Sequence, residues 1–127
     1  MNTKFKIALS VLAGAALGAA AVQGLHAQAK PKAYIVTELE VLDAAANAAF
    51  TPLIRAAQTA GGGRNLRTAG GKIVAFVGTA PKSVGITEFD SLDQAVAWRN
   101  GQAWKDLSPQ RDKAIKIIQQ YAVEAQN

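Results

Sequence analysis

The sequence predicts one α+β domain with the ferredoxin-like order of elements, βαββαβ, behind a secretory signal peptide. Two observations support this fold class. Short β-branched segments of alternating polarity alternate along the chain with segments of helical character, which are alanine-rich or begin with a capping side chain. This order is the pattern of a sheet covered by helices. The chain has 127 residues, which is enough for one core of this kind but not for several.

Residues 1–27 differ from the rest of the chain and have the three parts of a signal peptide. Two lysines near the N-terminus give a basic start, and residues 7–22 then carry no charge. Small residues follow that suit cleavage after Ala27 or, alternatively, after Ala29. We therefore expect an export signal first and a ferredoxin-like domain over residues 28–127.

An uncleaved membrane anchor is the alternative for this first segment. Its uncharged run, residues 7–22, is shorter than the ~20 residues that span a bilayer and is rich in Ala and Gly. We therefore expect cleavage, a periplasmic or secreted location and no stable membrane anchor afterwards. Loss of Lys4 and Lys6 lowers the formal net charge from +5 to +3, and loss of His26 leaves a mature chain without His or Cys.

The first element of the mature chain is a predicted strand over residues 34–41, which is β-branched and partly alternating. Asp43 can then cap a helix, since its carboxylate can accept from free N–H groups in the first turn. The alanine-rich segment 44–60 carries an apolar stripe at helical spacing, and Pro52 predicts a kink or a break into two short helices. Glycines 61–63 end this helix.

A β region is predicted next. Residues 64–68 form a short extended piece, residues 69–72 a glycine-containing turn and residues 73–77 a strand. After a loop that contains a proline, residues 84–89 form another strand. We expect these segments to make a β-meander or a long bent hairpin.

Two helices are predicted in the following segment. Ser91 and Gln94 have the spacing of a capping box, which marks a helix N-terminus. The helix that they open is broken at residues 100–101, Asn-Gly. A second helix covers residues 102–115, with a bend expected at Pro109.

Residues 117–125 are predicted to close the chain as a strand, and the alternative is a helix that continues to Tyr121. With this strand in place, one face of the sheet packs on the helices and the other still carries apolar side chains. A contiguous exposed patch of that kind usually marks an interface. We therefore expect a homodimer that pairs two such faces.

Several short motifs resemble the pattern of a known family. They are Lys32-Ala-Tyr34, Gly62-Gly63-Arg64, Arg67-Thr-Ala-Gly70-Gly71-Lys72, Ile86-Thr-Glu88-Phe89 followed by Ser91-Leu92, and Trp98-Arg-Asn100. In this order and spacing they resemble the bacterial domain of unknown function numbered 1330, in the dimeric α/β-barrel superfamily, over residues 32–125. The resemblance implies a ferredoxin-like subunit that dimerises sheet to sheet, and it implies no established reaction.

More distant relatives in that superfamily include cofactor-independent monooxygenases, lactone isomerases and haem-dependent enzymes. Most members of the resembled family lack an export signal, so the predicted signal peptide is a departure from its pattern. A cytoplasmic metabolic role is therefore not expected for this chain.

Glu38 and Glu88 are the first candidates for catalysis. They lie at comparable depths of two strands that are antiparallel neighbours in a ferredoxin-like sheet, so they can share a proton and do acid–base work. The alternative is that one or both face solvent or pair with Arg or Lys. The resemblance favours Glu88, which matches the family's Glu-Phe position.

Tyr34 and Asn100 complete the candidate catalytic set around Glu88. Tyr34, at the start of its strand, can donate a phenol proton, and Asn100 can orient a ligand carbonyl. Packing at a barrel rim is the structural alternative for Tyr34, and helix capping is the alternative for Asn100. An enzyme of this kind requires a closed pocket in which Glu88 has a raised pKa and a polar partner.

The candidate ligand-binding residues are Glu38, Arg64, Trp98 and Trp104. Arg64 belongs to a basic cluster at the glycine-rich hairpin and can hold an anion; the alternative is a solvated hairpin edge. Trp98 and Trp104 can wall an apolar pocket, and the alternative is that both anchor the core.

Composition excludes several function classes. A mature chain without His or Cys has no Ser-His-Asp triad, thiolate site or multi-His site, and we expect neither a cofactor nor a metal. Glycines 61–63 end a helix and lack the Gly-Lys-Ser/Thr of a phosphate loop. The small positive charge forms no basic stripe, so no nucleic-acid partner is expected.

These observations predict a small exported homodimer that binds a small aromatic or anionic molecule between sheet and helices. A purely structural periplasmic module is compatible with the same sequence. The alternative function is a cofactor-independent oxygenase or isomerase that uses Glu88 with Tyr34 or Asn100.

Overall fold

The computed structural model describes residues 30–126, and all of these except Lys30 belong to one compact unit that begins at Pro31. The predicted signal peptide over residues 1–27 and its cleavage sites lie outside the described residues. The described elements are, in chain order, β1 (Ala33–Val41), α2 (Ala44–Ala60), β2 (Arg64–Asn65), β3 (Ser83–Phe89), α3 (Leu92–Arg99), α4 (Gln102–Asp106), α5 (Ser108–Ala114) and β4 (Ile115–Glu124).

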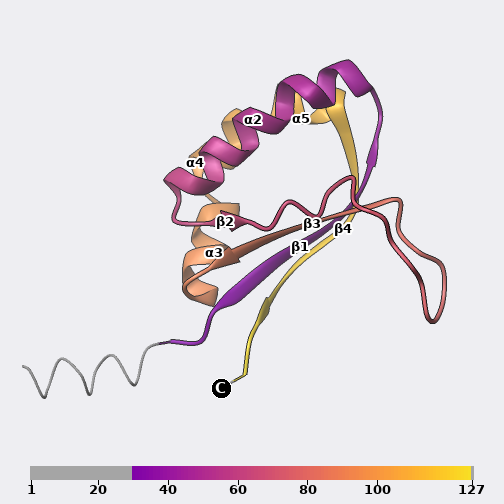
Figure 1. Cartoon of the computed structure of the whole chain (residues 1–127). Helices are drawn as coiled ribbons and strands as arrows, with labels where there is room; N and C mark the ends of the chain where they lie inside the picture. Colours follow the sequence, from indigo (N-terminus) through magenta and orange to yellow (C-terminus); the bar gives the residue numbers. More distant parts are fainter. Residues whose placement is uncertain (1–29, 127) are drawn as a thin grey trace, which may run out of the picture. The chain divides into compact units, whose positions relative to one another are not determined.

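These elements form an α+β unit around a four-stranded sheet. The strand order is β2-β3-β1-β4, and every neighbouring pair is antiparallel. The helices gather on one side of the sheet, as Figure 1 shows. The predicted α+β class is confirmed, and the arrangement is compatible with the predicted ferredoxin-like fold. None of the helices within residues 30–126 is long and apolar enough to cross a bilayer.

The alternation along β1 assigns its side chains to two faces. Ala33 and Ile35 are buried on the face that meets the helices, and Phe89, which pairs with Ala33 across β3, shares that face. Tyr34 and Val36 point the other way. We call this second side, made by the even-numbered residues 34–40 of β1 and the residues paired with them in β3 and β4, the open face.

The core lies between the sheet and the short helices. Phe89 is completely buried, and Trp98 and Trp104 are 8% and 7% exposed. The rings of Phe89 and Trp98 are 5.7 Å apart between centroids, and those of Trp98 and Trp104 are 5.6 Å apart in an edge-on arrangement. Such tilted aromatic contacts are favourable beyond the area they bury, so this row of rings ties α3 and α4 to the sheet.

α2 begins where the sequence predicts. The Asp43 side chain accepts a hydrogen bond of 2.7 Å from the Ala46 N–H. The predicted break at Pro52 is wrong, because α2 runs through it as one helix of 17 residues. Pro52 has no N–H to donate to the Ala48 carbonyl one turn earlier. Next to it, the Thr51 hydroxyl donates to the Asn47 carbonyl at 2.7 Å.

The segment between α2 and β3 contains less strand than predicted. β2 has two residues, although the Leu66 N–H and the Thr68 hydroxyl continue its hydrogen bonding to β3. The predicted strand over residues 73–77 is wrong: residues 71–82 form an extended loop, seen projecting in Figure 1, which we call the arm. Its side chains at Phe76 and Val77 are 94% and 96% exposed, so no burial favours strand pairing there.

α3 begins at the predicted N-cap, Ser91, although the return bond of Gln94 involves the residue before it. The Ser91 hydroxyl accepts from the Gln94 N–H at 3.1 Å, and the Gln94 side chain accepts in return from the Asp90 N–H. The predicted helix over 102–115 is two helices, α4 and α5, which meet at Leu107. The break precedes Pro109 because proline is accommodated in the first turn of a helix, where its missing N–H costs nothing.

β4 confirms the predicted closing strand and begins two residues earlier than expected, at Ile115. The alternative helix to Tyr121 is wrong. β4 pairs along the whole of β1, with one register irregularity between Glu38 and Leu39. It is an edge strand, and the groove described below lies between it and α3.

Candidate functional site

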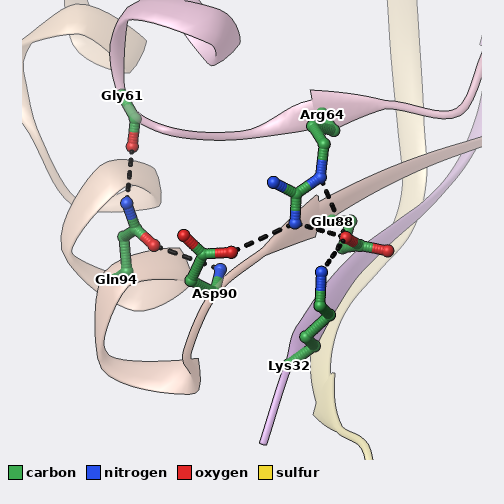
Figure 2. A network of polar contacts seen from close by, with 6 residues as sticks. All are labelled: Lys32, Gly61, Arg64, Glu88, Asp90 and Gln94. Atoms are coloured by element: carbon green, nitrogen blue, oxygen red, sulfur yellow. Dashed lines mark hydrogen bonds and ion pairs between the residues drawn. The ribbon is translucent and has the colours of Figure 1, made fainter. Parts of the chain in front are cut away.

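Glu88 is the centre of an ionic network at one end of the open face (Figure 2). Its carboxylate accepts from Lys32 Nζ at 2.9 Å, from Arg64 Nε at 2.9 Å, and also from Arg64 Nη2. The same Nη2 reaches Asp90 at 3.1 Å. Arg64 can make these contacts because it pairs directly with Glu88 across β2 and β3 and projects from the same face.

These contacts favour the charged form of both partners. The hydrogen bonds from Lys32 and then Arg64 lower the pKa of Glu88, and the hydrogen bonds to Glu88 and Asp90 raise the pKa of Arg64. A general acid at neutral pH needs the opposite shift. The ion pair with Arg and Lys, the alternative reading of Glu88, is confirmed, and the raised pKa that an acid–base role requires is not found.

The expected pairing of Glu38 with Glu88 is wrong. Tyr34 lies opposite Glu88, and Glu38 lies opposite Val84. Because the strands are antiparallel, depth from the start of one strand corresponds to depth from the end of the other. The two glutamates are therefore four residues apart along the sheet, about 13 Å at ~3.3 Å per residue, and cannot share a proton.

The three candidate catalytic residues are not brought together. Tyr34 and Glu88 are cross-strand neighbours on the open face. Asn100 is the C-cap of α3, and it lines a groove on the helix-covered side of the sheet. The sheet therefore separates Asn100 from Glu88 and Tyr34, and the expected use of Asn100 together with Glu88 is wrong.

Trp98 and Trp104 anchor the core, which was the alternative to their lining a pocket. The Trp98 indole Nε1 donates to the Ala57 carbonyl at 3.0 Å and so joins α3 to α2. Trp104 is packed on Trp98 and is contacted by two guanidinium groups, those of Arg99 and Arg111, each 4.1 Å from the ring centre. Neither indole lines the groove described next.

A groove of about 440 Å³ lies between α3 and β4, and we call it the α3–β4 groove. Five of its lining residues are aliphatic and four are polar. The residues are Ile35, Ala95, Val96, Arg99, Asn100, Ile117, Gln120, Tyr121 and Ala122. Small-molecule sites usually have this composition, an apolar wall with a few placed polar groups.

Arg99 is the charged side chain of this groove, and its neighbours orient it. Its Nε donates to Gln120 Oε1 at 2.5 Å, and Gln120 Nε2 donates to the Thr37 hydroxyl at 2.9 Å. The guanidinium carbon lies over the Trp104 ring, 4.1 Å from its centroid. Burial is the main cause that lowers the pKa of Arg99, and the positive charge of Arg111 adds to it.

A second hollow of about 310 Å³ lies beside Arg111, at the start of β4. Arg111 is already committed there to local contacts, donating to the Trp104 carbonyl and the Ser108 hydroxyl at 2.8 Å each. Its Nε also lies 3.9 Å from Asp112. The Arg111 guanidinium therefore has fewer uncommitted donors than that of Arg99.

Sequence reasoning missed Arg99, Gln120 and Tyr121 as groove residues. Arg99 is the middle residue of the Trp98-Arg-Asn100 motif. The sequence indicated this segment, but its two outer residues were the ones chosen as candidates. The positions of Gln120 and Tyr121 depend on the register of β4 against β1, and no local sequence pattern predicts that register.

Within residues 30–126, no group of three or more His, Cys, Asp and Glu side chains is placed to hold a metal ion. No match to the chain was found among curated proteins. The model of one protein family, described as Domain of unknown function (DUF1330), matches residues 32–125, which run from just before β1 to just after β4. The chain therefore belongs to the DUF1330 family of domains of unknown function.

Proposed function

We propose that this protein is an exported homodimer that binds a small molecule in the α3–β4 groove. The observation that carries the proposal is the groove itself, which combines an aliphatic wall with an oriented arginine. Its volume of about 440 Å³ falls in the usual range of small-molecule sites. Membership of the dimeric α/β-barrel superfamily is part of the proposal, and the sheet order is compatible with it.

The lining of the groove favours binding over catalysis. Among the described residues that line it there is no Asp, Glu, His or Lys. Acid–base catalysis needs a positioned group that exchanges a proton near the operating pH. The carboxylate considered for that task, Glu88, is held in ion pairs on the open face. We therefore favour a binding protein over a cofactor-independent oxygenase or isomerase.

The homodimer is proposed from the open face. Ile86, Val36 and Tyr121 pair in register and make an apolar row across the middle of this face, and Tyr121 is 46% exposed. Ion pairs of Glu88 lie toward one end of the face and an ion pair of Glu40 toward the other. A face with an apolar middle and both charge signs at each end is complementary to a second copy of itself. Sheet-to-sheet pairing would remove this row from water.

Export is proposed from the basic, uncharged and small-residue parts of residues 1–27. The mass of the protein recovered from the periplasm or medium of an expressing host tests it. We expect a chain that starts at Gln28 or Lys30. A chain that still starts at Met1 or Asn2 would contradict export by a cleaved signal.

The binding proposal is tested with a fragment library and two-dimensional ¹⁵N–¹H NMR of the purified protein. We expect hits whose shift changes centre on Ala95, Asn100 and Ala122. Val96→Trp places an indole at a groove position that is 44% exposed and should abolish these hits. Leu53→Trp is the matched control, because Leu53 is 43% exposed on α2 and does not line the groove. Fragments that collect elsewhere, or no hits, would refute the proposal.

A further inference from the structure

We infer that the ligand of the α3–β4 groove is an organic anion with an apolar body and a carboxylate, whose counter-charge is the Arg99 guanidinium. The inference deepens the proposed function and rests on it. It assigns the charge and chemical class of the ligand from the groove's own charges and unused donors.

The charge of Arg99 is not balanced by the residues of the groove. Arg99 brings a positive charge to a groove that is lined by no acidic residue. Among the described residues no carboxylate lies within ion-pair distance of it, whereas Arg64 reaches Glu88 and Asp90. Partial burial removes some of the water around this cation, and Gln120 and the Trp104 ring, which are both uncharged, do not balance its charge. The groove is therefore electrostatically complementary to one negative charge.

The two terminal nitrogens of Arg99 are unused donors. Nε is committed to Gln120, which is itself held by Thr37. No hydrogen bond is formed by either terminal nitrogen with another described residue, and no buried side-chain donor of the described part lacks a partner. The two terminal nitrogens are thus accessible from outside the protein. An arginine in this state presents an end-on pair of N–H donors, which matches the two oxygens of a carboxylate.

Trp104 orients the Arg99 guanidinium, and Arg111 repels it. Contact with Trp104 holds the guanidinium plane, so little side-chain freedom is lost when a ligand binds. The Arg111 guanidinium approaches the same ring and repels Arg99, and together with burial this lowers the pKa of Arg99. A bound carboxylate offsets that repulsion. An inorganic anion would not use the aliphatic wall of Ile35, Val96 and Ile117.

The test compares two probes of nearly equal shape, 4-phenylbutyrate and its uncharged amide 4-phenylbutanamide. Each is titrated into the purified protein and followed by the amide signals of Ala95 and Asn100 and by the Arg99 Nε–H signal. We expect the carboxylate to bind at least tenfold more tightly than the amide. Arg99→Gln should remove this preference, and Arg99→Lys should restore part of it. Arg55→Gln, which removes an arginine of α2 away from the groove, should leave it unchanged.

Each outcome decides between the two claims. If the amide binds the groove as tightly as the carboxylate, the inference is overturned and the proposed binding function stands. If neither probe shifts the groove signals, both are overturned. An unchanged preference in Arg99→Gln overturns the role of Arg99. Should Arg99→Gln fail to fold, Arg99→Lys carries the test, because loss of the end-on fork should still lower the preference severalfold.

Discussion

Gly61 lies directly against the indole of Trp98. A Cβ atom built at Gly61 would stand 2.1 Å from Trp98 Cδ1 and 2.8 Å from Nε1. The indole cannot move away freely, because it is buried and its Nε1 donates to the Ala57 carbonyl. The glycines that end α2 therefore set how closely α2 approaches α3, in addition to ending the helix.

Gly61→Ala should accordingly destabilise the fold. Overpacking of a buried contact costs about 1–3 kcal/mol, and urea unfolding measures it. Gly85→Ala is the matched control on β3, where a Cβ would meet nothing within 4 Å. Its free energy of unfolding should change by less than ~1 kcal/mol. Equal effects of the two substitutions would show that the contact with Trp98 is not tight.

Glu88→Gln should change how stability depends on pH. The pKa of Glu88 is lowered in the folded chain, so the folded state binds its proton less readily than the unfolded state. Its ion pairs therefore contribute above the ordinary pKa of glutamate, and this contribution is lost as the pH falls through the lowered value. We expect a lower Tm for Glu88→Gln at pH 7 and a difference from wild type that shrinks toward pH 3.

The control for that experiment is Glu38→Gln, on the same face of the sheet. Glu38 forms no ion pair with another described residue. At pH 7 this substitution should lower the Tm less than Glu88→Gln does. A difference for Glu88→Gln that stays constant between pH 3 and pH 7 would contradict the proposed ionic contribution.

Asp43→Ala should lose the N-cap of α2. The carboxylate accepts from the Ala46 N–H at 2.7 Å, and removal of such a cap costs about 0.5–2 kcal/mol. Asp112→Ala serves as the comparison, since that side chain is 76% exposed and lies 3.9 Å from Arg111. We expect it to change the free energy of unfolding by ~0.5 kcal/mol or less. Equal losses for both substitutions would argue against the cap.

Val36→Asp should weaken the proposed dimer. It places a charge in the middle of the apolar row of the open face, where a second subunit would bury it. Sedimentation velocity should show a dissociation constant at least tenfold higher than that of the wild type. Leu53→Asp adds the same charge to α2, outside this face, and should sediment as the wild type does. A wild-type monomer at all concentrations would refute the dimer.

Much of the fold could be predicted because its signals are local. The Asp43 cap, the Ser91 cap and the alternation along β1 each depend on residues a few positions apart. The errors at residues 73–77 and near Pro109 have a different origin. A β-branched segment becomes a strand only if it finds a partner, and a proline in a first turn starts a helix rather than bending one.

The site could be predicted only in part, because it depends on register. Glu38 and Glu88 lie at comparable depths from the starts of their own strands, but antiparallel pairing places them in different rows of the sheet. Arg99 meets Gln120 only because α3 packs beside β4, a contact between segments 21 residues apart. The sequence pattern contains the chemistry of these side chains, whereas the packing of the chain decides which of them meet.

The most direct test of the binding claim is a crystal structure of the wild-type protein purified after export from its native periplasm. We expect density for an organic molecule in the α3–β4 groove, with an acidic group at the terminal nitrogens of Arg99. A groove filled by side chains of the protein itself, or a ligand bound away from Arg99, would contradict it.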